Sequence, residues 1–155
     1  MTDHITETLA RLGLTLPKPA APVAAYVPTV ETHGLLYISG QLPFRNGDLM
    51  TGRLGEDVDV DFGYEAARHC GLMLVAQIQR ALGSLDRVER IVKLGVFVTS
   101  DTRFTDQPKV ANGASDLMEA LFGENGKHAR SAVGVPSLPL GAAVEIDAIV
   151  AVKPA

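Results

Sequence analysis

The chain has 155 residues, of which 46% are hydrophobic and 21% charged, and its formal net charge is −4 at pH 7. This length suits one domain that can bury a core without disulfides. No apolar run reaches the roughly 18 residues that a membrane span needs. The N-terminal sequence MTDHITETLARLG is acidic and lacks the pattern of a secretory signal. We therefore expect a cytoplasmic globular protein with no membrane partner.

Charge and side-chain chemistry exclude further classes. A net negative charge with scattered basic residues argues against a nucleic-acid partner, which usually needs a basic face. The single cysteine, Cys70, lies in an apolar helical stretch, where we expect a buried, reduced thiol. The four histidines form no HxH or HxxxH cluster, and His69 is adjacent to Cys70 rather than on the same helix face. The sequence therefore predicts no metal site.

The N-terminal part is predicted to be a helix followed by an arm. A short helix is expected over Asp3–Leu12, with Thr2 or Asp3 as its cap. The segment LPKPAAP that follows is too rich in proline for a central strand. We predict that residues 1–22 form this helix and arm, and that residues 23–155 form one domain.

Strands and a long helix follow in the first half of the domain. Residues 23–32 and 35–43 are predicted strands, separated by the turn signal His33–Gly34. The sequence FRNGDLM next closes a small hairpin through Asn46–Gly47. The clearest helix covers residues 60–82 and ends at Gly83. Its apolar stripe is predicted at positions 67, 70, 74, 78, 81 and 82.

The second half contains another helix and three strands. VERIVKLGVFVTS, residues 88–100, is typical of a central strand, and a helix is expected over residues 108–121. Residues 129–135 and 142–152 are the last two predicted strands. This order predicts an α+β domain with a mostly antiparallel sheet and two main helices on one face. The other face of the sheet must then meet solvent or another subunit.

The last two strands are expected to pair as an antiparallel hairpin around PSLPLG. Burying Val133 together with the valines of the final strand would place Arg130 and Glu145 together on the opposite face, beside the small Ala132 and Gly134. The planar arginine fork suits a carboxylate, and a glutamate can orient water or transfer a proton. The same pattern also fits a structural ion pair on an exposed face, so the residues alone leave both interpretations open.

Three sequence blocks together resemble the RidA family, also called the YjgF family. ARSAVGVPSLPLGAAVEIDAIVAV resembles its signature, LLYISGQLP its SGQ strand, and GSLDRVERIVKLGVFVTSDTRF its central segment. These blocks cover most of the chain from about Tyr26 onward. The resemblance implies a chorismate-mutase-like fold, usually a homotrimer with clefts between subunits. It also implies hydrolysis of reactive enamines and imines, such as 2-aminoacrylate, to 2-keto acids and ammonia without a cofactor.

The resemblance assigns roles to particular residues. Arg130 would clamp the substrate carboxylate, Glu145 would position the attacking water, and the backbone at Ala132 would bind near the substrate nitrogen. The remaining candidates for substrate binding match the family's tyrosine, SGQ motif and helical asparagine, and they are Tyr26, Ser39, Gly40 and Asn112, with Gln41 and Asn46 as secondary candidates. Each also has a structural explanation: a strand tyrosine in the core, a serine in a turn, an exposed asparagine on a helix.

The chain also departs from the family pattern. His128 replaces the usual proline before ARS and adds a polar group at the cleft mouth, and the sequence AAYVP replaces the usual context of the tyrosine. The N-terminal arm and a longer gap between Phe104 and Asn112 indicate a divergent branch with its own substrate preference. Two other functions stay open. The cleft could bind small carboxylates without catalysis, or the protein could cleave RNA, against which the acidic balance argues.

Overall fold

The computed structural model describes residues 3–19, 21 and 24–155. These described residues form three α-helices, which are α1 (His4–Arg11), α2 (Val60–Leu82) and α3 (Gln107–Phe122). The strands, in chain order, are β1 (Thr29–Thr32), β2 (Leu35–Gln41), β3 (Phe44–Arg45), β4 (Asp48–Leu49), β5 (Val88–Thr99), β6 (Ala129–Val135) and β7 (Val144–Val152). Short 3-10 helices lie at Leu85–Arg87, Gly123–Gly126 and Pro139–Gly141.

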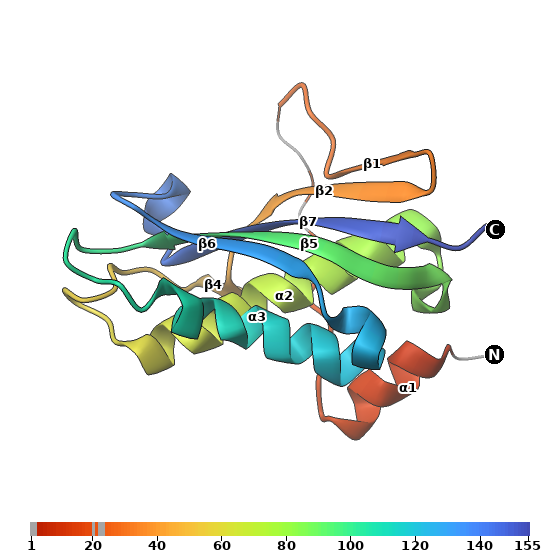
Figure 1. The fold of residues 1–155 in the computed structure, drawn as a ribbon, viewed down its shortest axis with the longest axis horizontal. Helices are drawn as coiled ribbons and strands as arrows, with labels where there is room; N and C mark the ends of the chain where they lie inside the picture. Colours follow the sequence, from red (N-terminus) through yellow and green to blue (C-terminus); the bar gives the residue numbers. More distant parts are fainter. Residues whose placement is uncertain (1–2, 20, 22–23) are drawn as a thin grey trace.

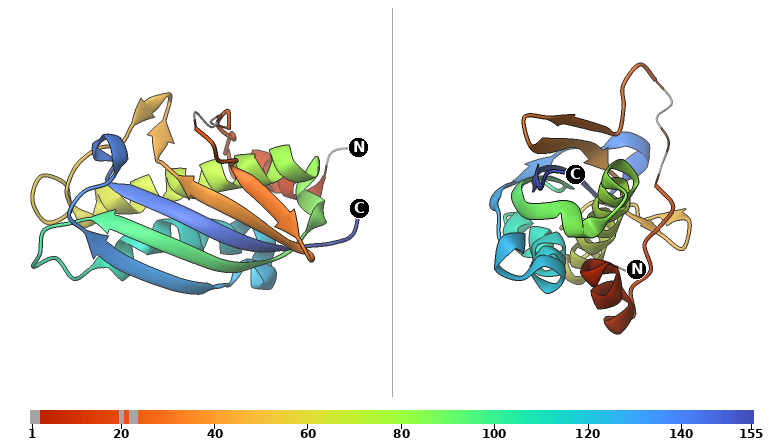
Figure 2. Two further views of the ribbon diagram at one scale, coloured as in Figure 1. Left: turned by 90° about the horizontal axis from the view of Figure 1, so that it is seen from above. Right: turned by 90° about the vertical axis from the view of Figure 1, so that its right-hand side faces the viewer.

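Five strands form one sheet in the order β1-β2-β7-β5-β6, and β3 and β4 form a separate hairpin. The left view of Figure 2 shows this order across the sheet. All neighbours in the large sheet are antiparallel except β5 and β6, which are parallel. Because two parallel strands need a crossover connection, α3 lies between β5 and β6 in the chain and packs under the sheet.

The two long helices cover one face of the sheet, and the other face is left open (Figure 1). Alternate residues of the strands point to the helices, so Leu94, Ile146 and Val150 are fully buried. Three helical glycines, Gly63, Gly71 and Gly113, let α2 and α3 approach closely, and a Cβ on Gly113 would clash with the carbonyl oxygen of Tyr64. The predicted α+β architecture, with helices on one face of a mostly antiparallel sheet, is confirmed.

The helices were predicted closely from their caps and periodicity. Helix α2 has the expected bounds and ends at Gly83, whose φ of 80° lies in the left-handed region that glycine favours. Cys70 is fully buried on its inner stripe, whereas Ala81, predicted on the same stripe, is exposed. The predicted hairpin at Asn46–Gly47 is present, with both residues at positive φ.

The strand predicted over residues 23–32 is wrong in its first half. Pairing begins only at Thr29, and residues 24–28 form a loop that leads into β1. Residue 23 lies outside the described residues. Thr2, one of the two predicted caps of the N-terminal helix, also lies outside them. The N-terminal helix is capped by Asp3, whose side chain accepts a hydrogen bond from the Thr6 amide. This helix packs onto the rest of the chain through Ile5 and Leu9, which join the hydrophobic core.

The predicted hairpin of the last two strands is also wrong. Strand β5 lies between β6 and β7, pairing with β6 in parallel and with β7 antiparallel. Arg130 stands opposite the buried Leu94 and therefore points to the helix face. Val133 points to the open face and is 46% exposed rather than buried. Alternation of apolar and polar residues predicts which side chains share a face of one strand. It does not predict which strand is the neighbour, and here β5 lies between β6 and β7.

Candidate functional site

Arg130 lies on the edge strand β6, where helix α3 holds one side of its guanidinium group. The Nη1 atom of Arg130 donates to Asn112 Oδ1 at 2.8 Å and to Ser115 Oγ at 3.0 Å. Asn112 and Ser115 are three residues apart in α3, so they share one helix face that is turned toward β6. The structure thus brings Arg130 and Asn112, two of the candidate site residues, together.

The other side of the Arg130 guanidinium group is open. Neither Nε nor Nη2 has a hydrogen-bond partner within residues 3–19, 21 and 24–155. These two groups form a fork that suits a carboxylate. The arginine lines an open hollow of about 410 Å³, whose other lining residues are Ser115, Asp116, Glu119, Lys127 and His128. The hollow can therefore admit a small anion to a partly anchored arginine.

Glu145 belongs to a second group of residues, on the open face of the sheet. It stands opposite Phe97 on β5, and Phe97 is 36% exposed. Burial raises the pKa of the Glu145 carboxyl, and the nearby charge of Asp147 raises it further. Gly40 provides the space for this side chain, since a Cβ there would lie 2.3 Å from Glu145 Oε1. The β-bulge in β2 between Ile38 and Gln41 brings Gly40 to this position.

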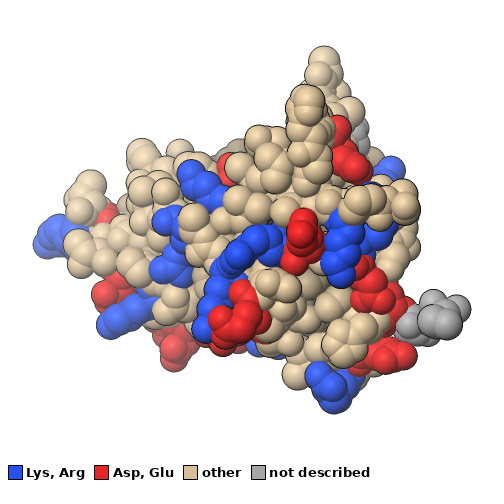
Figure 3. Space-filling view, turned by 45° about the vertical axis from the view of Figure 1, so that its right-hand side comes forward, with Lys and Arg blue, Asp and Glu red and all other residues tan. Residues whose placement is uncertain are grey.

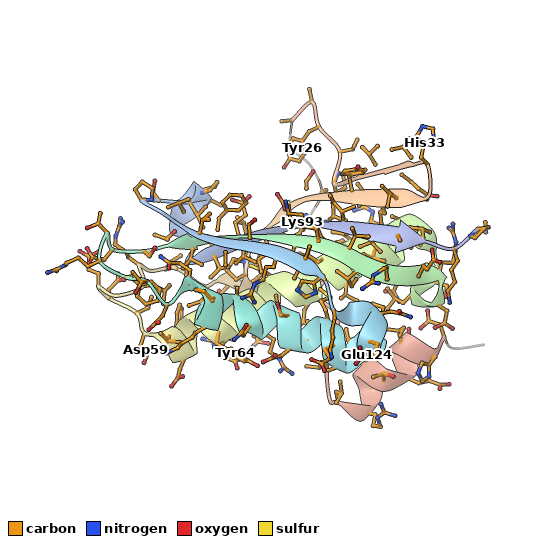
Figure 4. The ribbon with its side chains drawn as sticks, in the orientation of Figure 1. Tyr26, His33, Asp59, Tyr64, Lys93 and Glu124 are labelled. Atoms are coloured by element: carbon orange, nitrogen blue, oxygen red, sulfur yellow. The ribbon has the colours of Figure 1, made fainter. Side chains whose placement is uncertain are left out.

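Tyr26 and Ser39 lie next to Gly40 in the same group. The Ser39 hydroxyl donates to the Val27 carbonyl at 2.9 Å, and its backbone N–H donates to the Pro28 carbonyl at 2.9 Å. Ser39 therefore fastens the loop that carries Tyr26 to the edge of β2. Tyr26 is 55% exposed and, with Gly40, lines a hollow of about 120 Å³. Tyr26 lies on the loop that leads into β1, and its hollow is also lined by Met73 and Gln77 of α2, whereas Lys93 lies on β5 (Figure 4).

The predicted site residues thus fall into two groups in one chain. The Arg130 group comprises Arg130, Asn112 and Ala132, and the Glu145 group comprises Glu145, Tyr26, Ser39 and Gly40. Arg130 and Glu145 point to opposite faces of the sheet, with β5 between their strands. Within a single chain they form neither an ion pair nor one cleft.

Three further candidate residues shape the two groups or lie apart from them. Ala132 lies two positions after Arg130 on the edge strand, and its side chain packs against the core. Gln41 is buried, and its Nε2 donates to the Ser39 carbonyl at 2.8 Å, which stabilises the bulge from below. Asn46 forms the turn of the β3–β4 hairpin.

Sequence reasoning missed Ser115 as a partner of Arg130. The signal was available in the spacing, because Ser115 follows Asn112 by three positions in a predicted helix, and such residues are neighbours on the helix surface. His128 was noted only as a polar substitution. In the structure its ring contacts Ser115, with 2.9 Å between Nε2 and Oγ.

Two features bear on other chemistries. Among the residues that the structure describes, no three His, Cys, Asp or Glu side chains cluster closely enough to hold a metal ion. The thiol of Cys70 is buried beneath the sheet, and burial raises its pKa. A thiol held in its protonated form under the sheet is structural rather than nucleophilic.

Comparison with known proteins places the chain in a family. Residues 6–150 match the family described as "YjgF/chorismate mutase-like, putative endoribonuclease". Protein TCP17 of Trypanosoma cruzi is 55% identical over 151 residues, which cover 96% of this chain and 94% of that protein. A 2-iminobutanoate/2-iminopropanoate deaminase of Dermatophagoides farinae is 27% identical, covering 90% of this chain and 95% of that protein.

A solved structure shows the same fold. The crystal structure of an Agrobacterium tumefaciens protein of unknown function superposes with a TM-score of 0.90 at 46% identity, covering 96% of this chain and 92% of that chain. The chain therefore belongs to the YjgF family, the RidA family of the sequence resemblance. In the described part of the chain, no helix is both long and apolar enough to cross a membrane.

Proposed function

We propose that the protein hydrolyses 2-imino acids and their enamine tautomers to 2-keto acids and ammonia. The observation that carries this proposal is the Arg130 guanidinium group, anchored on one side by α3 and open on the other. An anchored fork fixes the position of a substrate carboxylate, and positioning is a large part of catalysis when the reactive carbon is already electrophilic. The name of the mite relative, a deaminase of such imines, supports the same chemistry.

Glu145 is the proposed group that orients water. Its raised pKa brings it closer to the range in which a carboxylate exchanges protons efficiently near neutral pH. Water adds to the C=N carbon while the imine nitrogen gains a proton. The resulting carbinolamine loses its hydroxyl proton and expels ammonia, which leaves the keto acid. Ala132, beside Arg130 on the edge strand, would offer its backbone to the substrate nitrogen. This chemistry requires no cofactor.

The complete site requires a second copy of the chain. The Arg130 group of one subunit would face the Glu145 group of its neighbour in a homotrimer, with Tyr26, Ser39 and Gly40 lining the shared cleft. The open face supports such an assembly because it carries large exposed apolar side chains. Val30 and Tyr37 stand opposite each other there, exposed by 51% and 44%, and Phe97 and Val133 form another pair. Exposed apolar surface of this kind is typical of subunit interfaces.

The competing functions are separable. A protein that only binds carboxylates would have little use for Glu145, since a second carboxylate beside the anion would repel it. RNA cleavage would need a surface that attracts phosphates. Figure 3 shows basic and acidic side chains interspersed on one face of the molecule, without a continuous basic area there.

The direct test is imine hydrolysis. An amino-acid oxidase would generate 2-imino acids in place, and semicarbazide would trap the imine that survives. Wild-type protein should reduce trapping, Arg130→Ala should not, and a panel of amino acids would rank the substrates. Absence of hydrolysis of every imine by a folded wild-type protein would refute the proposal. Carboxylate binding without turnover would then identify a binding protein, and salt-sensitive RNA cleavage a nuclease.

A further inference from the structure

The Arg130 site contains a hydrogen-bonded pair that the proposed hydrolysis does not use. His128 Nδ1 lies 2.6 Å from the Gly126 carbonyl oxygen, and its Nε2 lies 2.9 Å from Ser115 Oγ. Ser115 Oγ in turn accepts a hydrogen bond from Arg130 Nη1. A continuous chain of hydrogen bonds therefore runs from the imidazole through one hydroxyl to the guanidinium group.

The partners of His128 determine where its protons lie. A carbonyl oxygen only accepts, so Nδ1 carries the hydrogen and donates to Gly126. In the neutral ring Nε2 then has a lone pair, and the Ser115 hydroxyl donates to it. Burial lowers the pKa of His128 and the charge of Arg130 lowers it further, although the bond to Gly126 works in the opposite direction. Together with the bond from Ser115, the lowered pKa favours the neutral imidazole in the free protein.

Protonation of His128 would not break this chain. A hydroxyl oxygen has two lone pairs, so Ser115 can accept from Arg130 Nη1 and from a protonated Nε2 together once its own hydrogen turns away. The charges around the imidazole come from Asp116 and Glu119 of α3, from Lys127, which pairs with Glu124, and from Arg130. The positive charge of Arg130 opposes protonation of His128. An anion bound to Arg130 would offset this charge and so raise the pKa of His128.

We propose that Ser115 and His128 position the Arg130 guanidinium group for a carboxylate, and that His128 takes up a proton when the carboxylate binds. The inference rests on the proposed carboxylate site at Arg130, but it does not require turnover. It makes His128 a positioning residue whose charge adds to the anion site when the site is filled. The added proton then lies on the far side of Ser115 and the guanidinium group from the bound anion, linked to it through the hydrogen bonds of that chain.

The test is calorimetric binding of 2-oxobutanoate to the intact protein in two buffers of different ionisation enthalpy. Wild type should take up a fraction of a proton per anion bound, and its affinity should rise about threefold or more from about pH 8 to about pH 6. His128→Gln should lose both the proton uptake and this pH dependence. Ser115→Ala should weaken binding about tenfold because Arg130 loses one of two anchors, and Ser115→Thr, which keeps the hydroxyl, should restore it.

His69→Gln is the matched control. The Nδ1 of His69 also contacts a backbone carbonyl, that of Glu65 at 2.8 Å, but no hydrogen bond links this ring to Arg130. Nitrogen NMR of the histidine rings should show His128 in the Nδ1–H form, and circular dichroism should show each variant folded. Unchanged proton uptake in His128→Gln, or no binding by wild type, would overturn the inference. Binding with proton uptake but without imine hydrolysis would leave it standing and refute only the proposed function.

Discussion

Arg130 and Glu145 lie on opposite faces of one five-stranded sheet, on strands that flank β5. Across β5, Arg130 stands beside Leu94, which is fully buried under the helices, while Glu145 stands beside Phe97, which is exposed on the open face. A side chain cannot cross a hydrogen-bonded sheet. If the two residues act on one substrate, they must therefore come from different copies of the chain.

Arg130→Ala should abolish most imine hydrolysis without unfolding the protein. Its guanidinium group is the proposed carboxylate anchor, and truncation of one partner of a hydrogen-bonded charge pair costs about 2–5 kcal/mol, so kcat/KM should fall at least about thirtyfold. Arg103→Ala is the control, because the Arg103 side chain is 92% exposed and, in the described part of the chain, its one ion pair is with Asp101. A loss of similar size in both variants would contradict the assigned role.

The pH dependence of hydrolysis should report the ionisation of Glu145. If Glu145 acts as a carboxylate, the rate falls as the pH drops through its pKa, which lies above the ordinary value of 4.5. Asp147 is one cause of that shift, so Asp147→Asn should lower the pKa and move the acid limb of kcat/KM to lower pH. Asp48→Asn, an exposed carboxylate in β4, should leave the limb in place. A limb that moved to higher pH in Asp147→Asn would argue against Glu145 as the titrating group.

A charge placed on the open face should dissociate the proposed trimer. Val133 is 46% exposed in the single chain, so Val133→Glu costs the isolated subunit little, but it would bury a charge in the proposed interface. Light scattering should then give the mass of a monomer instead of a trimer. Leu12→Glu is a matched control, since Leu12 is 44% exposed but lies after α1, on the helix side. Equal masses for Val133→Glu and wild type would mean that another surface joins the subunits.

Asp3 should stabilise the packing of α1. Burial opposes its ionisation, but hydrogen bonds from Thr6, Leu85 and Ser84 outweigh this and lower its pKa. The charged form therefore stabilises the fold above the unfolded pKa, and this stability is lost as the pH falls through the lower folded pKa. Asp3→Ala should reduce the free energy of unfolding at neutral pH by about 1–2 kcal/mol, measured by urea denaturation. Asp3→Asn keeps an oxygen that can cap α1, so it should lower the free energy of unfolding less than Asp3→Ala does. Equal losses in the two variants would mean that the charge of Asp3, and not its capping, stabilises the helix.

Much of the fold follows from local signals in the sequence. The caps at Asp59 and Gly83 delimit α2, and the positive φ values at Asn46 and Gly47 match a hairpin that their sequence predicts. Alternation in β7 correctly separated the buried Ile146 from Glu145 on the other face. These features depend on residues close together in the chain, so one sequence is enough to predict them.

The pairing of β6 depends on distant residues, and the sequence did not predict it. Both faces of β6 carry small side chains, and neither alternation nor turn residues distinguish a hairpin with β7 from a parallel partner on β5. The family resemblance selected Arg130 and Glu145, while their separation by the sheet became visible only in the structure. Ser115 was missed because its role depends on the side of β6 to which Arg130 points.

The most direct test of the shared site is complementation between two inactive variants. Arg130→Ala and Glu145→Gln would be unfolded together, refolded as a mixture, and compared with each variant refolded alone. In a random mixture about a quarter of the interfaces join an intact Arg130 to an intact Glu145 of the neighbour, so about a quarter of the wild-type rate should return. If the mixed oligomers form but remain as inactive as the separate variants, Arg130 and Glu145 do not act together across a subunit interface.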